Sequence, residues 1–318
     1  MGMAAGGQHG NKAVLAALAG NLGIAVAKLI GFALTRSSAM LAESVHSIAD
    51  SGNQALLLLG GKQAEREPTE SHQFGYGRAR YFWSFVVALV LFVLGSAFAV
   101  YEGIHKIQHP EQIESFGIAL GILGVAIGLE SWSIRTAMSE SIPLKGDLSW
   151  WQFIRVSRSP ELPVVLLEDF GALAGLGIAF LAILVSRLTG DPIWDGIGTV
   201  AIGGLLGVIA VILVIEMRSL LLGEGASPED MTKIKAAIVA TPGVTRLIHI
   251  RTQHFGPDEL LVAAKLAFDP SLDGTGVAHA INRVEAAVRA QVPYARPMYI
   301  ETGIFADSET VNADEASD

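Results

Sequence analysis

The chain has 318 residues, of which 51% are hydrophobic and 17% are charged, and its mean hydropathy is +0.46. Soluble domains carry about 25% charged residues, so this composition indicates a membrane protein with a soluble part attached. The net charge is −9 and no basic block is present, which argues against nucleic acid as a partner. Because cysteine is absent, disulfides and thiolate metal sites are excluded.

Six apolar stretches are long enough to cross ~30 Å of hydrocarbon, which takes about 20 helical residues. They are Lys12–Leu34, Ala39–Gly61, Tyr81–Gly103, Phe116–Met138, Leu162–Leu188 and Trp194–Ile215. The predicted membrane domain therefore covers residues 12–218 and follows an N-terminal tail of residues 1–11.

The loops on one side of these six spans carry more Lys and Arg than the loops on the other side. The positive-inside rule places the richer side in the cytoplasm, and an even number of spans then puts both termini there. The N-terminus does not have the pattern of a removable signal peptide or presequence, which favours the cytoplasmic membrane of a bacterium.

A soluble α/β domain is predicted over residues 222–306, in the order α-β-β-α-β. Its first helix begins at Ser227-Pro228-Glu229-Asp230, where Ser caps the helix and the acids meet its positive end. Residues 244–254, 260–268 and 296–304 have the pattern of strands, and residues 276–291 that of an amphipathic helix. The acidic tail 307–318 is predicted to be disordered.

Ionisable residues inside the predicted spans are the strongest functional signal, because charge is costly in lipid. His46 and Asp50 are four residues apart, so they share one helical face, and Asn53 and Gln54 continue it. Such a row of donors suits a divalent metal, although a polar stripe for helix–helix hydrogen bonding is the alternative. In the fifth span, the adjacent Glu168 and Asp169 can hardly both be ionised without a cation nearby.

Two motifs make the chain resemble the cation diffusion facilitator family, whose members are six-span proteins with a cytoplasmic α/β domain. The run from Arg36 to Asp50, RSSAMLAESVHSIAD, resembles the family motif of the second span. The run Phe74-Gly75-Tyr76-Gly77-Arg78-Ala79-Arg80 resembles the motif that opens the third span. The resemblance covers residues 12–304 and implies a homodimer that exports Zn²⁺ or a similar ion in exchange for protons.

The chain departs from the family pattern in its fifth span and in its soluble domain. Val165 stands where the family carries a histidine, and Glu168 stands beside the family aspartate, Asp169, as in the branch that resembles mitochondrial-type zinc transporters. The resemblance then implies a ligand set of His46, Asp50 and Asp169, with Glu168 as a candidate fourth. An oxygen-rich site of this kind could admit Mn²⁺, Fe²⁺ or Co²⁺ as well as Zn²⁺.

In the soluble domain, Ile248, Lys265 and Ile300 occupy positions where family members carry metal-binding histidines. His249 and His254 remain on a predicted strand and His279 on a predicted helix, so the histidines are scattered and a tight metal site is not expected there. No resident cofactor is expected, and no nucleotide-binding loop is present, so a proton gradient is the expected energy source.

Two hypotheses from other functional classes remain as alternatives to proton-coupled efflux. A membrane metalloenzyme would use the same ligands to activate water, but the sequence has no HExxH motif, and an enzyme is not expected. A non-transporting membrane scaffold with a vestigial metal site is the other reading.

Overall fold

The computed structural model describes residues 5–35, 38–110 and 116–304. For some residues of the helices near the N-terminus and of the helix that begins at Phe116, it describes the backbone alone; His46 and Glu43 are among them. The chain divides into two compact units, Met1–Leu222 and Gly223–Asp318.

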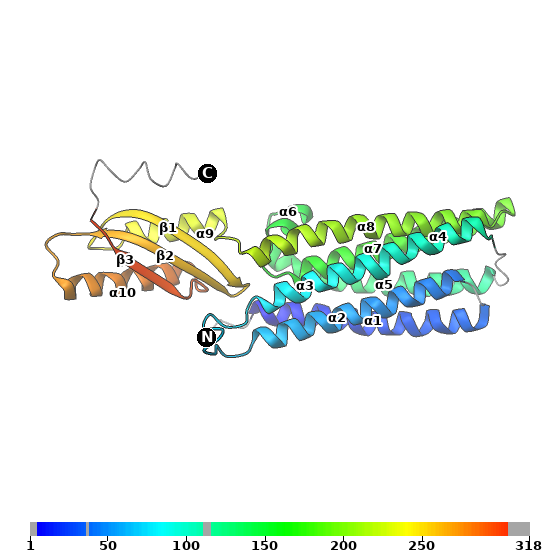
Figure 1. The fold of residues 1–318 in the computed structure, drawn as a ribbon, viewed down its shortest axis with the longest axis horizontal. Coiled ribbons are helices and arrows are strands. Elements are labelled where there is room, and N and C mark those ends of the chain that lie inside the picture. Colours follow the sequence, from blue (N-terminus) through cyan, green and yellow to red (C-terminus); the bar gives the residue numbers. More distant parts are fainter. Residues whose placement is uncertain (1–4, 36–37, 111–115, 305–318) are drawn as a thin grey trace. The chain divides into compact units, whose positions relative to one another are not determined.

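The first unit is helical, and its long helices lie side by side (Figure 1). The elements are α1 (Ala5–Thr35), α2 (Ser38–Ala64), α3 (Ala79–Val90), η1 (Leu91–Ala97), α4 (Phe98–Gln108), α5 (Phe116–Lys145), α6 (Trp150–Val156), α7 (Glu161–Thr189) and α8 (Ile193–Leu222). α3, the π-helical segment η1 and α4 follow one another without a break, so they form one continuous span.

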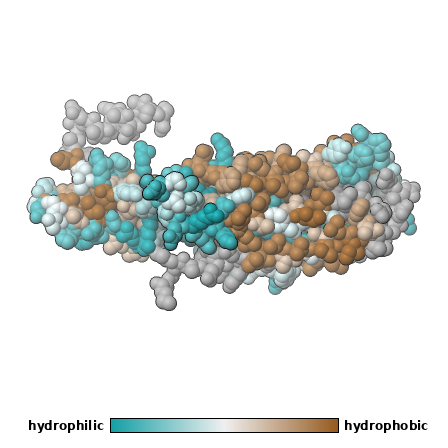
Figure 2. All heavy atoms as spheres, turned by 60° about the horizontal axis from the view of Figure 1, so that its bottom comes forward, coloured by the Kyte–Doolittle hydropathy of each residue, from teal (hydrophilic) through white to brown (hydrophobic). Residues whose placement is uncertain are grey.

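Within the described residues, three helical stretches have the length and hydropathy of a membrane span: Ala79–Gln108, Glu161–Thr189 and Ile193–Leu222. Large apolar side chains cover their outer surface, among them Leu181 and Val208, which are each 60% exposed. Figure 2 shows hydrophobic residues over most of the visible face of this unit. A water-soluble bundle would bury such side chains, so this surface is suited to lipid and confirms the predicted apolar helical region.

Helices also cover the other three predicted spans, in α1, α2 and α5, which have 31, 27 and 30 residues. The total of six membrane spans nevertheless stays a prediction. α1 begins at Ala5, so the helix extends into the segment 1–11 that composition indicated as a tail. The short helix α6 was not predicted, although Ser149 and Gln152 form a capping box at its start.

The second unit has the predicted order of elements: α9 (Pro228–Val239), β1 (Val244–Gly256), β2 (Glu259–Phe268), α10 (Gly274–Gln291) and β3 (Met298–Thr302). The sheet order is β1-β2-β3; β1 and β2 are antiparallel, whereas β2 and β3 are parallel. Its core is formed by apolar side chains of the two helices and of β2, which include Ile234, Ile238, Leu260, Val262, Leu266, Val284 and Val288. A small α/β domain at the C-terminal end is thereby confirmed.

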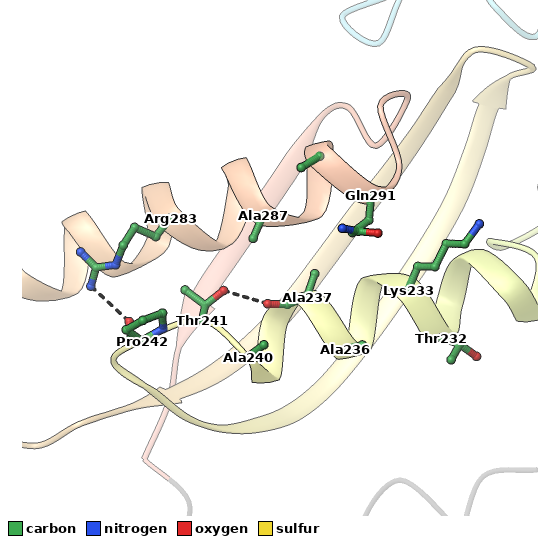
Figure 3. Close-up of a pocket in the computed structure, with 11 residues that line it drawn as sticks. Thr232, Lys233, Ala236, Ala237, Ala240, Thr241, Pro242, Arg283, Ala287 and Gln291 are labelled. Carbon is green, nitrogen blue, oxygen red and sulfur yellow. Dashed lines mark hydrogen bonds between the residues drawn. The ribbon is translucent and has the colours of Figure 1, made fainter.

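A shallow groove lies between α9 and α10 (Figure 3). Its volume is 730 Å³, and small side chains such as Ala236, Ala240 and Ala287 line it, with Lys233 and Arg283 among the lining residues. The Arg283 guanidinium donates to the carbonyl oxygen of Pro242 at 3.1 Å. None of the lining residues is a histidine or a carboxylate, so the groove has no metal-ligating side chain.

Glycines bring α8 and the third span into backbone contact. A Cβ atom built on Gly203 would lie 2.7 Å from Val100 Cγ2 and 2.8 Å from the Val100 nitrogen. At the end of the same interface, Lys106 Nζ lies 3.0 Å from Asp195 Oδ2, and both side chains are largely buried. Close approach at small residues is a common way to pack helices in membranes, and here it joins α8 tightly to η1 and α4.

Gly203→Ala should therefore destabilise the protein. The added methyl group overlaps the Val100 backbone, and overpacking of this kind costs about 1–3 kcal/mol. Gly204→Ala is the matched control, because a Cβ on Gly204 meets no atom within 4 Å. Thermal unfolding of both variants in detergent should show a lower Tm for Gly203→Ala alone. An equal Tm for the two variants would contradict the tight contact.

Candidate metal centre

One face of α2 carries buried polar side chains through the middle of the helical unit. Asp50 is 2% exposed, and Asn53 and Gln54 are fully buried. His46 lies on the same helix, four residues before Asp50, but its side chain lies outside the described part of the chain. The spacing of i and i+4 along a continuous helix supports the predicted shared face of His46 and Asp50.

The adjacent carboxylates of α7 point to different neighbours. Glu168 accepts hydrogen bonds from two amides of α2: Asn53 Nδ2 donates to Oε1 at 2.5 Å, and Gln54 Nε2 donates to Oε2 at 3.0 Å. Asp169 accepts a hydrogen bond at Oδ2 from the Ser133 hydroxyl of α5, at 2.7 Å. Neighbouring helical residues differ by about 100° in direction, so one carboxylate meets α2 and the other meets α5.

Four carboxyl groups lie close enough to interact through their charges. Asp50, Asp169 and Glu130 all interact electrostatically with Glu168, and Asp50 also interacts with Asp169. All four side chains are at most 2% exposed. Concentrated negative charge in an apolar interior needs protons or a cation to offset it, because water cannot reach and stabilise it.

The predicted carboxylates lie close together in the described structure, but they do not form a complete metal-coordination site. Among the side chains that are described, no three His, Asp or Glu residues are grouped as a metal ion requires. Asp50 and Glu168 come from facing sides of the α2–α7 contact, and both Glu168 oxygens are engaged by amides. In this conformation Glu168 is a hydrogen-bond acceptor of α2 residues.

Several polar partners of the centre were not predicted. Ser133 gave no signal by itself, although it stands three residues after Glu130 and so shares its helical face. Glu130 is 1% exposed and belongs to the buried group of carboxyls. Asn21 of α1 donates to Gln54 Oε1 at 3.4 Å, and Lys28 Nζ donates to the Ser47 hydroxyl at 2.9 Å.

The histidines of the second unit lie apart, as expected. His254 is 2% exposed, its Nδ1 lies 3.2 Å from the Gly256 carbonyl oxygen, and its ring stacks on Tyr294. His249 lies on β1 opposite Lys265, and His279 is exposed on α10. These positions are those of packing and surface residues.

Lys265 of β2 forms an ion pair with Glu301 of β3 at 2.8 Å. The hydrogen bond from Lys265 and its positive charge lower the pKa of the Glu301 carboxyl. That this unit has no tight metal site stays a prediction.

Comparison with known proteins identifies the family of the chain. The family model described as the cation efflux transmembrane domain matches residues 14–222. The chain is 32% identical over 245 residues to a Xenopus laevis protein named proton-coupled zinc antiporter SLC30A9, mitochondrial; the match covers 76% of this chain and 44% of that protein. It is 30% identical over 264 residues to metal tolerance protein C4 of Arabidopsis thaliana, covering 82% of this chain and 58% of that protein.

A bacterial relative is matched as well. The chain is 28% identical to the metal cation efflux system protein CzcD of Cupriavidus metallidurans, over 75% of this chain and 70% of that protein. It spans under half of the frog relative's length. The model match extends over most of the chain and includes every helix that bears the buried carboxyl groups, α2, α5 and α7. The chain belongs to the cation efflux family.

Proposed function

We propose that this protein exports a divalent cation, foremost Zn²⁺, across a membrane by exchange for protons. The observation that carries the proposal is the group of buried carboxyls Asp50, Glu168 and Asp169 inside an apolar helical unit. The names of the relatives, zinc antiporter and metal cation efflux protein, support the same direction of transport.

The donor set explains how metal and protons exchange at one place. We assign His46, Asp50 and Asp169 as ligands, with Glu168 beside them. A metal binds neutral imidazole and ionised carboxylate, whereas protonation of either removes the lone pair that coordination needs. Opening of the site to the opposite side of the membrane therefore lets protons displace the metal, and the protonated carrier returns. The proton gradient supplies the energy.

We propose a topology of six spans, formed by α1, α2, the continuous helix Ala79–Gln108, α5, α7 and α8. The larger share of Lys and Arg on the side of both termini supports cytoplasmic termini. The bacterial cytoplasmic membrane stays the predicted location. The matched relatives come from a bacterium and from eukaryotes, and the frog protein's name refers to mitochondria.

The centre is rich in oxygen donors, which favours a second candidate function: an exporter that prefers Mn²⁺ or Fe²⁺. Carboxylate oxygens suit these harder ions, whereas imidazole suits zinc. A scaffold with a vestigial site would need no group of buried carboxyls in the membrane, which cost stability. The family to which the chain belongs is one of transporters rather than enzymes.

We propose further that the second unit joins two copies of the chain into a homodimer without needing a metal. Its supporting features are a self-contained apolar core and histidines that lie apart. Dimerisation of this kind rests on apolar and polar surface contacts.

His46→Ala and Asp50→Ala should each abolish divalent cation flux, because each removes a proposed ligand of the cation. The measurement is uptake by proteoliposomes with an imposed pH gradient, across Zn²⁺, Mn²⁺, Fe²⁺ and Co²⁺. Ile48→Ala is the matched control, since Ile48 lies on the same helix but is 50% exposed on its outer surface. Wild-type flux in either ligand variant would refute the assigned site, and absence of flux in the unaltered protein would refute the function.

Asp169→Asn should impair transport more than Glu168→Gln. Loss of a ligand charge should leave almost no metal binding, whereas loss of a group next to a ligand weakens affinity by about 10–100-fold. Metal affinity and flux of both variants should be measured side by side at several pH values. The reverse ranking would make Glu168 the ligand, and near-normal behaviour of both would remove α7 from the site.

The isolated fragment 222–306 should bind no Zn²⁺ with submicromolar affinity. The reason is that Lys265 is paired with Glu301 and that His249, His254 and His279 lie on different parts of the unit. Isothermal titration calorimetry is the measurement, with sedimentation of the same sample with and without chelator to follow dimerisation. Tight stoichiometric binding would overturn this assignment.

A further inference from the structure

The carboxylate of Glu168 is held on both sides by amides of a different helix. Asn53 Nδ2 donates to one oxygen at 2.5 Å, and Gln54 Nε2 donates to the other at 3.0 Å. The two amide side chains are fully buried and Glu168 is 2% exposed. One donor on each oxygen, both from the same helix, fixes the orientation of the Glu168 carboxyl group.

A third amide orients one of the two, Gln54. Asn21 Nδ2 of α1 donates to Gln54 Oε1 at 3.4 Å. Because Gln54 Oε1 accepts this hydrogen bond from α1, the NH₂ group of Gln54 faces α7 and donates to Glu168. Asn21, Gln54 and Glu168 therefore form a hydrogen-bonded chain across α1, α2 and α7, and we call Asn53, Gln54 and Asn21 the amide clamp.

Asp169, the neighbouring carboxylate, is held differently. In the described structure its hydrogen-bond donor is the Ser133 hydroxyl, which contacts Oδ2 alone. Asp169 can thus turn an oxygen toward a cation with less rearrangement than Glu168, whose two oxygens are both held in the direction of α2 by amides.

We propose that the amide clamp is a determinant of metal selectivity, because it withholds Glu168 from the cation. This inference rests on the proposed transport function. With Glu168 engaged, the assigned ligands are His46, Asp50 and Asp169, a small set that suits the tetrahedral coordination of Zn²⁺. With the clamp removed, the free Glu168 carboxylate adds up to two oxygens, and a larger oxygen-rich set suits Mn²⁺, which prefers octahedral coordination.

The test is a double-mutant cycle read out as the ratio of Zn²⁺ to Mn²⁺ flux. The variants are Asn53→Leu, Gln54→Met, Glu168→Gln and the combination of each clamp variant with Glu168→Gln, all as full-length protein in proteoliposomes. Leu and Met match Asn and Gln closely in size but donate no hydrogen bond. Gel filtration and circular dichroism check that each variant is folded.

Asn53→Leu and Gln54→Met should each lower the Zn²⁺-to-Mn²⁺ ratio by about tenfold, the lower end of what loss of a ligand's hydrogen-bonding partner costs. In the Glu168→Gln background the same two changes should leave the ratio unaltered, because the carboxylate on which they act is gone. A general packing defect would lower both fluxes equally in either background. Asn53→Ser, a smaller change that keeps a hydroxyl donor, should restore part of the selectivity.

Two results would overturn the amide clamp while leaving the transport function in place. One is an unchanged ratio in folded, transporting Asn53→Leu or Gln54→Met. The other is an equal change in the ratio with and without the Glu168 carboxylate, which would show that the effect does not pass through Glu168. Should Asn53→Leu fail to fold, Gln54→Met with and without Glu168→Gln carries the same comparison. Absence of flux of any divalent ion in the unaltered protein would instead refute the proposed function.

Discussion

Burial of carboxylates in an apolar helical unit is the constraint on which the centre of this protein depends. Removing a carboxylate from water costs several kcal/mol even after the surroundings relax, so each buried group needs partners. Glu168 has the amides of Asn53 and Gln54, and Asp169 has the hydroxyl of Ser133. The polar residues of α2 and α5 thus stabilise the carboxylates of α7. Without these partners, the same polar residues would weaken two apolar helices.

The first unit uses two kinds of helix contact. α8 packs on η1 and α4 through glycines, where a methyl group at Gly203 would meet backbone atoms. α2 and α5 contact α7 through hydrogen bonds to carboxylates instead. A cation or a proton changes the charge of the second kind of contact and leaves the first untouched. α7 belongs to both kinds of contact, because a Cβ atom on Gly171 of α7 would lie 2.7 Å from Ile209 Cδ1 of α8.

The buried amides also bear on the proposal that a carboxylate-rich centre transports zinc. Three or four carboxylates would by themselves favour harder ions with more oxygen ligands. Hydrogen bonds from neutral amides reduce the number of oxygens that are ready to coordinate and add no charge of their own. Selectivity can then depend on residues beside the ligands, as is common for metal sites in which neighbouring groups orient the ligands.

Local sequence signals were sufficient for much of the fold. Runs of about 20 apolar residues predicted the helical stretches, since a span must satisfy its backbone hydrogen bonds internally. Alternating residues predicted β1 and β2, and Ser227 with Pro228 marked the start of α9. The capping box at Ser149 and Gln152 is a similar local signal for the start of α6. It stands outside any long apolar run, so the apolar pattern did not predict this helix.

Asp50, Glu168 and Asp169 are recognisable as unusual without coordinates, because a carboxylate within an apolar helix is costly however the helix packs. Spacing along α2 also predicts that Asn53 and Gln54 lie near the face of Asp50. The contacts of Glu168 with α2 and of Asp169 with Ser133, and the burial of Glu130 beside them, follow from helix packing and could not be predicted. The physical reason is that helical periodicity sets direction about one axis, whereas the partner of each side chain depends on how separate helices pack.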